Sequence, residues 1–94
     1  MTIKSKIDPI EQHVIDEIRK LRLVHHLRQK DIASIIKTTT SFVGNVENTG
    51  NPAKYNLKHI NLLADYFKVS PKFFFPEKPI FRKADLLFSE AKHL

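Results

Sequence analysis

Apolar residues recur along this chain at spacings of three and four, the period of helices that pack on one side. In the first such segment the apolar face comprises Ile10, Val14, Ile18 and Leu21. Asp8, Pro9 and Glu11 mark its start, because aspartate caps a helix, proline fits the first turn and glutamate completes a capping box. The pattern predicts a first helix that begins at Pro9 and ends near His25 or His26.

Residues 29–48 predict two short helices joined by a tight turn. The apolar positions are Ile32, Ala33, Ile35 and Ile36 in the first, which begins at Gln29, and Phe42, Val43 and Val46 in the second, residues 40–48. The hydroxyl residues 38–41 favour a helix start, since their oxygens accept from free backbone N–H groups. Helices this short bury little surface alone, so we expect other helices behind them.

A loop over residues 49–55 leads to a fourth helix that Asn56 caps. Its predicted inner face comprises Leu57, Ile60, Leu63, Ala64 and Phe67. Ser70 and Pro71 begin a last short turn, and the aromatic triplet at residues 73–75 is predicted to close the core.

The last part of the chain follows a break at residues 76–79. It carries Ala84, Leu87, Phe88 and Ala91 at helical spacing. Three interpretations stay open: a helix folded back on the domain, a dimer contact or a frayed tail.

Together these elements predict an all-α fold with five helices. The chain has 94 residues, which suits one domain, and only two glycines. We expect an N-terminal arm at residues 1–7, a helical domain at residues 8–76 and a C-terminal tail or short amphipathic helix at residues 77–94.

Charge and composition limit the classes of molecule that this chain is expected to bind. Lys and Arg number 16 against 10 acidic residues, a formal net charge of +6, which favours polyanions such as nucleic acid or an anionic membrane surface. The chain has no cysteine, which excludes disulfides and thiolate chemistry. Neither a signal peptide nor a membrane-spanning run is evident, so we expect a cytoplasmic protein that does not bind membranes.

If the apolar side of the helix at residues 40–48 faces the core, its polar side faces outward. That polar side comprises Thr40, Ser41, Gly44, Asn45 and Asn48. An uncharged, hydrogen-bonding helix face on a basic protein suits a DNA major groove.

Four groups of residues carry a family resemblance. They are Ile18-Arg19-x-Leu21-Arg22; Leu27-x-Gln29-x-x-Ile32-Ala33; Val43-x-x-Val46-Glu47-Asn48; and Leu57-x-x-Ile60-x-x-Leu63-Ala64-x-x-Phe67-x-Val69-Ser70. Residues 18–75, well over half of the chain, thereby resemble the Cro/cI-like (XRE-type) helix-turn-helix family. The resemblance implies a five-helix, lambda-repressor-like domain that binds double-stranded DNA, usually as a homodimer, and regulates transcription.

The resemblance also implies residue roles. The expected base contacts are Thr40, Ser41, Gly44 and Asn45, on the recognition helix. The expected phosphate contacts are Gln29, Thr39 and Asn48, to which we add Lys54 in the following loop. Arg22 and Glu47 are expected to form an internal ion pair between the first and third helices.

Two departures from the family pattern matter. Lys37 stands where the family usually has a turn glycine, and a left-handed conformation there would cost on the order of 1 kcal/mol. Gly44 lies inside a helix, at a cost of about 1 kcal/mol relative to alanine. Two explanations for a glycine at position 44 are equally good. Either the helix merely tolerates it, or the absence of a side chain lets the backbone approach DNA closely.

The sequence predicts no metal, no cofactor and no enzymatic activity. His25 and His26 are adjacent, so on a helix they point in different directions and make a poor metal pair. A phosphate-binding glycine loop and a nucleophile with a base at motif spacing are both lacking. The leading hypothesis is a DNA-binding regulator, which the family resemblance implies to be a repressor. The alternative is an antitoxin-like or adaptor module whose C-terminal segment binds a protein partner.

Overall fold

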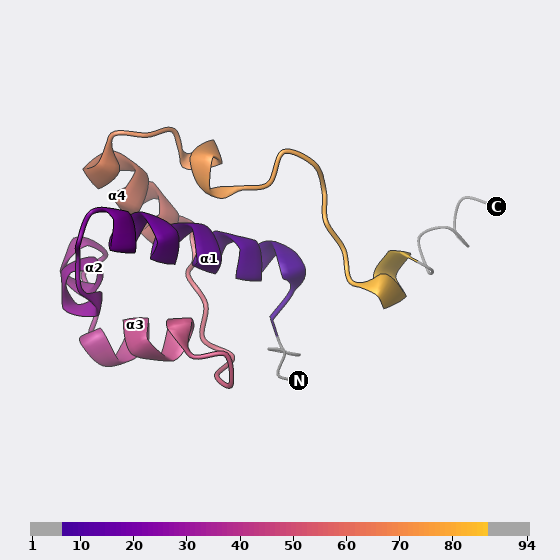
Figure 1. Ribbon diagram of the computed structural model, residues 1–94, viewed down its shortest axis with the longest axis horizontal. Coiled ribbons are helices and arrows are strands. Elements are labelled where there is room, and N and C mark those ends of the chain that lie inside the picture. The colour runs from indigo at the N-terminus through magenta and orange to yellow at the C-terminus, as the bar shows by residue number, and fades with distance from the viewer. Residues whose placement is uncertain (1–6, 87–94) are drawn as a thin grey trace.

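The computed structural model describes residues 7–86. This part is a compact all-α domain, without strands, of about five helices (Figure 1). They are α1 (Pro9–Val24), α2 (Gln29–Ile35), α3 (Thr40–Glu47), α4 (Leu57–Phe67) and the 3₁₀ helix η1 (Pro71–Phe74). Residues 83–86 are also helical, whereas residues 1–6 of the predicted arm and Leu87, Phe88 and Ala91 lie outside the described residues.

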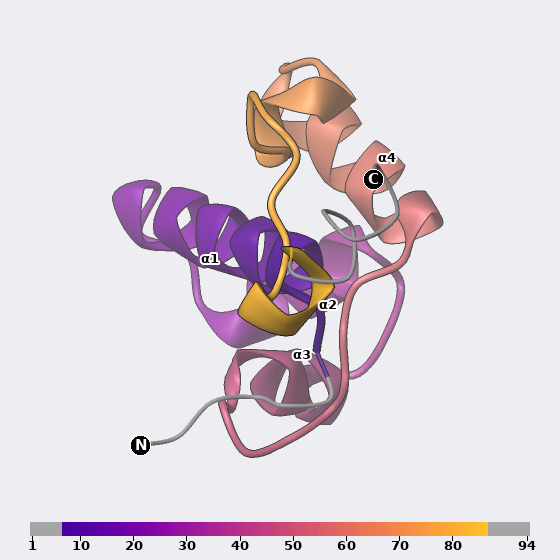
Figure 2. The same cartoon turned by 90° about the vertical axis from the view of Figure 1, so that its right-hand side faces the viewer.

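The two short helices are covered by the longer ones, as expected. Figures 1 and 2 show α3 along one edge of the molecule, with α1 and α2 between it and α4. Each element contributes a fully buried side chain to one core: Ile18, Ile32, Val43, Val46, Leu63 and Phe74. No helix in the described part is long and apolar enough to cross a membrane.

Helix starts follow the predicted capping residues. The Asp8 carboxylate accepts from the N–H of Ile10, and Glu11 accepts from the N–H of Asp8, which forms the predicted capping box. Thr39 caps α3 and Asn56 caps α4, while α2 begins at Gln29. The ends of α1 and α3 fall within about a turn of their predicted positions, with His25 and Asn48 as the C-caps.

Three helix ends share one closing conformation, which the sequence indicated only at Lys37. Three non-glycine residues, His26, Lys37 and Lys68, have φ values of 57°, 60° and 60°. After each of them, the next N–H donates to the carbonyl five residues back, at 2.9–3.1 Å. This is the Schellman closure, which usually places glycine in the left-handed position. Lys37 therefore keeps the tight turn between α2 and α3 at the conformational cost anticipated above.

Several inner-face predictions need correction. Leu57 was expected in the core, but its side chain is 75% exposed because it lies at the first position of α4, beyond the packed turns. Ile10 is also partly exposed. Of the aromatic triplet, Phe74 is fully buried, Phe75 is partly buried and Phe73 is about half exposed. Ile7 is buried, so the packed region begins one residue before the predicted boundary.

Replacement of Lys37 by glycine should stabilise the domain. Lys37→Gly removes the left-handed strain of a side-chain-bearing residue, so the free energy of unfolding should rise by up to about 1 kcal/mol. Urea unfolding would measure this change. The matched control is Ser34→Gly, an exposed position inside α2, where glycine should lower stability by about 0.5 kcal/mol. A loss of stability in both variants would contradict the assignment of strain to Lys37.

Candidate functional site

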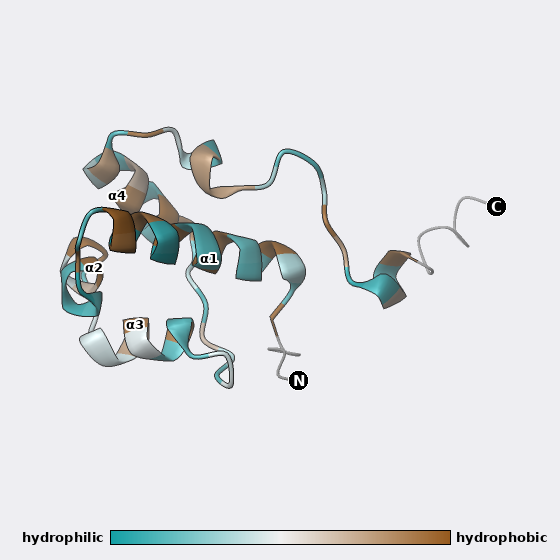
Figure 3. Ribbon diagram, viewed as in Figure 1, coloured by the Kyte–Doolittle hydropathy of each residue, from teal (hydrophilic) through white to brown (hydrophobic). Residues whose placement is uncertain are grey.

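The outer side of α3 is polar and open to solvent. Thr40, Ser41 and Asn45 are exposed, and Gly44 is partly exposed beside them. Figure 3 shows this helix mostly in the pale and teal colours of weakly hydrophobic and hydrophilic residues. The four predicted base contacts are thus brought together on one accessible helix face. Their hydrogen-bonding groups can reach a flat or grooved partner without rearrangement of the core.

The two predicted phosphate contacts at the ends of α3 also serve as caps. The Thr39 hydroxyl oxygen accepts from the N–H of Phe42 at 3.1 Å, which leaves its O–H free to donate. The Asn48 carboxamide oxygen accepts from the N–H of Gly50 at 2.9 Å, in the turn that follows α3, which leaves its NH₂ group able to donate. Both side chains are exposed, so Thr39 can donate to a partner while it caps the helix, and Asn48 can do so while it holds the turn.

Gly44 faces the side chain of Gln29 across the α2–α3 contact. A Cβ added at Gly44 would lie 3.4 Å from the Gln29 Oε1, an ordinary van der Waals distance. The packing of the domain therefore leaves room for alanine, which would favour the helix by about 1 kcal/mol. Space inside the fold does not explain why this position is glycine.

The centre of the site is the carboxylate of Glu47, at the end of α3. Its Oε2 accepts from Arg22 Nε at 2.9 Å, and its Oε1 accepts from Arg22 Nη2 at 2.8 Å. Gln29 Nε2 donates to the same Oε1 at 3.0 Å. The predicted ion pair between Arg22 and Glu47 is therefore present, in the two-pronged geometry that gives the strongest such pairs.

This cluster joins three helices and is largely hidden from water. The side chains of Glu47 and Arg22 are 5% and 11% exposed. Arg22 Nη1 also donates to the carbonyl of Leu27 at 3.0 Å, so the arginine holds the α1–α2 connection as well. Arg19 lies farther out, with its Nε 3.6 Å from Glu47 Oε1 and its side chain 56% exposed. We define the Glu47 cluster as Glu47, Arg22 and Gln29.

Gln29 has a role that the sequence did not reveal. One of its amide N–H groups is used by Glu47, so at most the second can donate to a phosphate. Its predicted phosphate contact stays a prediction, and the structural bond adds a reason for glutamine at this position. The sequence contained no separate signal for that bond, because Gln29 belongs to the second segment of the family pattern, where the implied role is a phosphate contact.

Tyr55 lies close to this cluster. Its ring is buried, and its hydroxyl has no hydrogen-bond partner among the described residues. Burial, and after it the negative charge of Glu47, raise the pKa of the Tyr55 hydroxyl well above its ordinary value. The tyrosine is therefore neutral at physiological pH and acts as a packing group behind α3.

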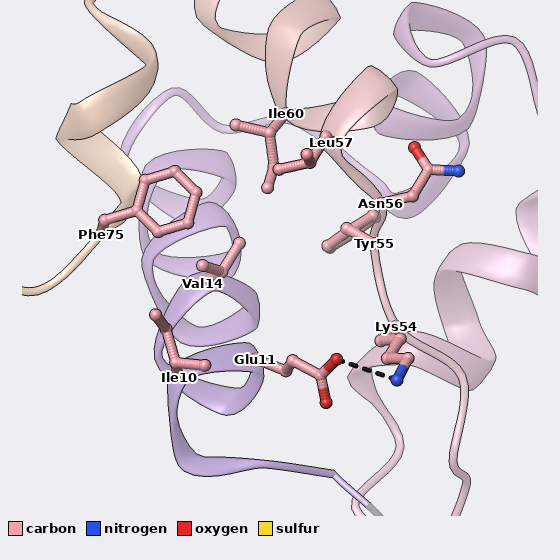
Figure 4. Close-up of a pocket in the computed structure, with 9 residues that line it drawn as sticks. All are labelled: Ile10, Glu11, Val14, Lys54, Tyr55, Asn56, Leu57, Ile60 and Phe75. Atoms are coloured by element: carbon pink, nitrogen blue, oxygen red, sulfur yellow. Dashed lines mark ion pairs between the residues drawn. The ribbon is translucent and has the colours of Figure 1, made fainter. Parts of the chain in front are cut away.

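Lys54 does not join the outer face of α3. Its Nζ is 2.8 Å from Glu11 Oε2, so the side chain reaches toward α1 (Figure 4). Burial alone would raise the pKa of the Glu11 carboxyl, but hydrogen bonds from Lys54 and the Asp8 N–H, with the charges of Lys54 and Arg82, lower it. A phosphate contact by Lys54 would require this partner to be exchanged, and that contact stays a prediction.

The same figure shows an open apolar groove between α1, the start of α4 and Phe75. Its volume is about 450 Å³, and its apolar lining comprises Ile10, Val14, Tyr55, Leu57, Ile60 and Phe75. Glu11, Lys54 and Asn56 supply its polar edge. We call it the α1–α4 groove. No pattern in the sequence indicated this groove, because Ile10 and Leu57 follow the same spacing as core residues.

His59 connects the start of α4 to the back of α3. Its ring lies 5.4 Å from that of Phe42 and 6.0 Å from that of Tyr55. Its Nδ1 accepts from the N–H of Asn56 at 3.2 Å, and only an unprotonated Nδ1 can accept. Burial, and after it the positive charge of Lys58, lower the pKa of His59.

Neither a metal site in the described residues nor a match to a known protein helps to assign a role to this site. Among residues 7–86, no three side chains of His, Cys, Asp or Glu converge as a metal site would require. Comparisons with protein-family models, with curated proteins and with solved structures give no match to this chain. The site must therefore be interpreted from its own geometry.

Loss of Arg22 should strongly destabilise the domain. Arg22→Ala leaves the buried Glu47 carboxylate without its counter-charge, which should lower the free energy of unfolding by roughly 3–5 kcal/mol. Arg19→Ala is the control. Arg19 is an exposed partner of the same carboxylate, so its removal should lower the free energy of unfolding by less than about 1 kcal/mol. Denaturant unfolding at low temperature would measure both.

The double variant Arg22→Met with Glu47→Met sharpens this test. It removes both charges, so it should lose much less stability than the sum of the two single losses. Additive losses would mean that the two side chains stabilise the fold independently.

Acidification should weaken the domain through His59. Because the folded-state pKa of His59 is lowered, the unfolded state binds more protons below about pH 6.5. The stabilisation is complete above that pH and is lost as the pH falls toward the folded-state pKa. His59→Gln keeps a capping side chain and should flatten the change in stability between about pH 7.5 and 5.5. If this variant keeps the full wild-type pH dependence, another group is responsible.

Proposed function

We propose that this chain is a sequence-specific double-stranded DNA-binding regulator of the Cro/cI-like (XRE-type) kind. In this proposal α2 and α3 are the helix-turn-helix pair of a lambda-repressor-like domain, and α3 enters the major groove. Two features of α3 together support this proposal. Its outer face presents exposed hydrogen-bonding side chains, and its last residue, Glu47, is held in a buried cluster against α1 and α2.

The proposed base contacts follow from the chemistry of that face. Asn45 can pair with the edge of adenine through both its amide donor and its acceptor. Ser41 and Thr40 can donate to or accept from a base or a phosphate. Gly44 would let the backbone approach the DNA closely, an explanation supported by the room that the fold leaves for a Cβ atom there.

Proposed phosphate contacts surround these positions. Thr39 and Asn48 lie at the two ends of α3 with donors to spare, and Gln29 retains one amide N–H. Such contacts fix the register of a protein on DNA without reading its sequence. The formal charge of +6, which includes exposed Lys30 at the start of α2 and exposed Lys37 in the α2–α3 turn, favours the approach to a polyanion.

We further propose that two copies act together as a repressor in the cytoplasm. A two-fold dimer places two recognition helices one helical turn of DNA apart, which raises both affinity and specificity. A bound dimer would exclude other proteins from the same DNA, and this simple mechanism needs no cofactor or catalytic group.

One observation favours the alternative of an antitoxin-like or adaptor module. Phe81 and Leu86 are about half exposed on the C-terminal segment, where they offer apolar contacts to a protein partner. The same α-helical domain could then serve as a scaffold for protein recognition. Selection of bound sequences from a random DNA pool separates the two functions, since only a DNA-binding regulator enriches a motif, and a dimer enriches two half-sites.

Replacement of Asn45 should weaken recognition of the selected sequence. Asn45→Ala removes a two-pronged base contact, so the binding free energy for that sequence should fall by about 1–3 kcal/mol, with less discrimination at one base position. Fluorescence anisotropy with selected and scrambled duplexes would measure it. Asn61→Ala, an exposed asparagine on α4, is the matched control and should bind as the wild type does.

Salt dependence provides the outcome that would contradict the proposal. Phosphate contacts release counterions, so the wild-type affinity should fall steeply between about 50 and 200 mM salt. An affinity that is flat over this range, or equal effects of Asn45→Ala and Asn61→Ala, would exclude recognition through α3.

A further inference from the structure

Two arginines of α1 approach the buried carboxylate of Glu47, but one of them is enough to neutralise it. Arg22 holds Glu47 through two hydrogen bonds, at 2.9 and 2.8 Å, and its side chain is only 11% exposed. Arg19 lies one turn earlier on α1, with its Nε 3.6 Å from Glu47 Oε1 and its side chain 56% exposed. The excess positive charge at this junction of three helices is therefore on the exposed arginine.

The contact with Glu47 orients Arg19 without using its hydrogen-bond donors. A separation of 3.6 Å is longer than a hydrogen bond between a guanidinium and a carboxylate. The Glu47 oxygens already accept three hydrogen bonds, two from Arg22 and one from Gln29. An exposed ion pair of this kind contributes little to stability, so Arg19 can exchange it for another anion at small cost.

Two further donors lie beside Arg19, on the other two helices of the junction. Gln29 Nε2 is 3.0 Å from Glu47 Oε1, the same oxygen that Arg19 approaches, and it keeps one N–H for a partner. Asn48 directly follows Glu47, is exposed and keeps its NH₂ group for donation. A phosphate has several acceptor oxygens, so a single phosphate can accept from all three side chains, while Arg22 neutralises the carboxylate beneath it.

We propose that Arg19 is a phosphate-binding residue, which turns from Glu47 to the DNA backbone and shares one phosphate with Gln29 and Asn48. This inference rests on the proposed function and adds a charged contact from α1 to the uncharged contacts already proposed for the other two residues. Arg22 keeps the carboxylate neutralised when Arg19 leaves it, so the fold does not change. A contact of this kind positions α3 in the groove and raises the affinity for every sequence alike.

Fluorescence anisotropy with the full chain and a duplex selected from the random pool tests this contact. Arg19→Ala should weaken binding to selected and scrambled duplexes alike, by about tenfold at about 100 mM salt, and should reduce the salt slope by about one. Arg19→Lys keeps the charge but loses the planar guanidinium, so it should restore part of the affinity. Thermal unfolding of both variants should stay close to that of the wild type, in contrast to Arg22→Ala.

The matched control removes the same charge from the next position of α1. Lys20 is 69% exposed, and its Nζ is 3.1 Å from Glu17 Oε2, so this side chain is directed to another partner. Lys20→Ala should weaken binding by no more than about twofold, because salt largely screens a charge that lies away from the contacts. Equal losses from Lys20→Ala and Arg19→Ala would reflect net charge alone and would overturn the inference.

A scan of neutral linkages locates the phosphate. A methylphosphonate replaces one charged phosphate oxygen by a methyl group, so it removes the charge at one chosen position of the selected duplex. In the wild type, one position for each bound copy should cost about tenfold or more in affinity. In Arg19→Ala the same position should cost about threefold or less, because the two changes remove one interaction. Additive losses at every position would show that Arg19 contacts no phosphate.

Failure of this inference and failure of the proposed function give different results. A wild type whose affinity is flat with salt excludes DNA binding through phosphate contacts, and both proposals fall. A wild type with a steep salt dependence, whose affinity and salt slope are unchanged in Arg19→Ala, retains the proposed function and overturns only the role of Arg19.

Discussion

The buried carboxylate of Glu47 is the constraint on which the arrangement of the helices depends. It accepts from Arg22 on α1 and from Gln29 on α2, while it belongs to α3. Helices of seven and eight residues cannot hold their own orientation, because isolated helices of that length are unstable in water. Apolar contacts hold α2 and α3 against the core, but such contacts have little directionality. The charged hydrogen bonds define the angle and register of α3.

Much of the helical scaffold could be predicted because its signals are local. Asp8, Thr39 and Asn56 cap helices through their own side chains, so sequence alone indicates where α1, α3 and α4 begin. The Arg22–Glu47 pair could also be predicted, although only from the resemblance of several segments together. Outward exposure of Thr40, Ser41 and Asn45 follows directly from the helical period once Val43 and Val46 face the core.

The remaining features depend on packing between distant segments, and periodicity does not contain that information. Leu57 and Leu63 share the apolar spacing of α4, yet Leu63 is fully buried and Leu57 is largely exposed, because none of the helices described in residues 7–86 covers the first turn. From the sequence, Lys54 is a loop cation that could contact a phosphate. In the structure, Glu11 on α1 pairs with it, with 2.8 Å between Lys54 Nζ and Glu11 Oε2. The helix ends at His26 and Lys68 were equally hidden, because these residues adopt a conformation that glycine usually supplies. At Lys37 the family pattern, which has a glycine there, already indicated that conformation.

The distribution of polar groups separates structural from outward-facing roles on α3. Glu47 uses both carboxylate oxygens inside the protein, whereas the side chains of Ser41 and Asn45 form no hydrogen bond within residues 7–86 and remain exposed. Substitutions on the outer face therefore leave the buried cluster intact, and the specificity of a binding surface can change without loss of the fold. Gly44 lies where the two sides meet, beside Gln29, and the packing of this domain does not require its helical cost of about 1 kcal/mol relative to alanine.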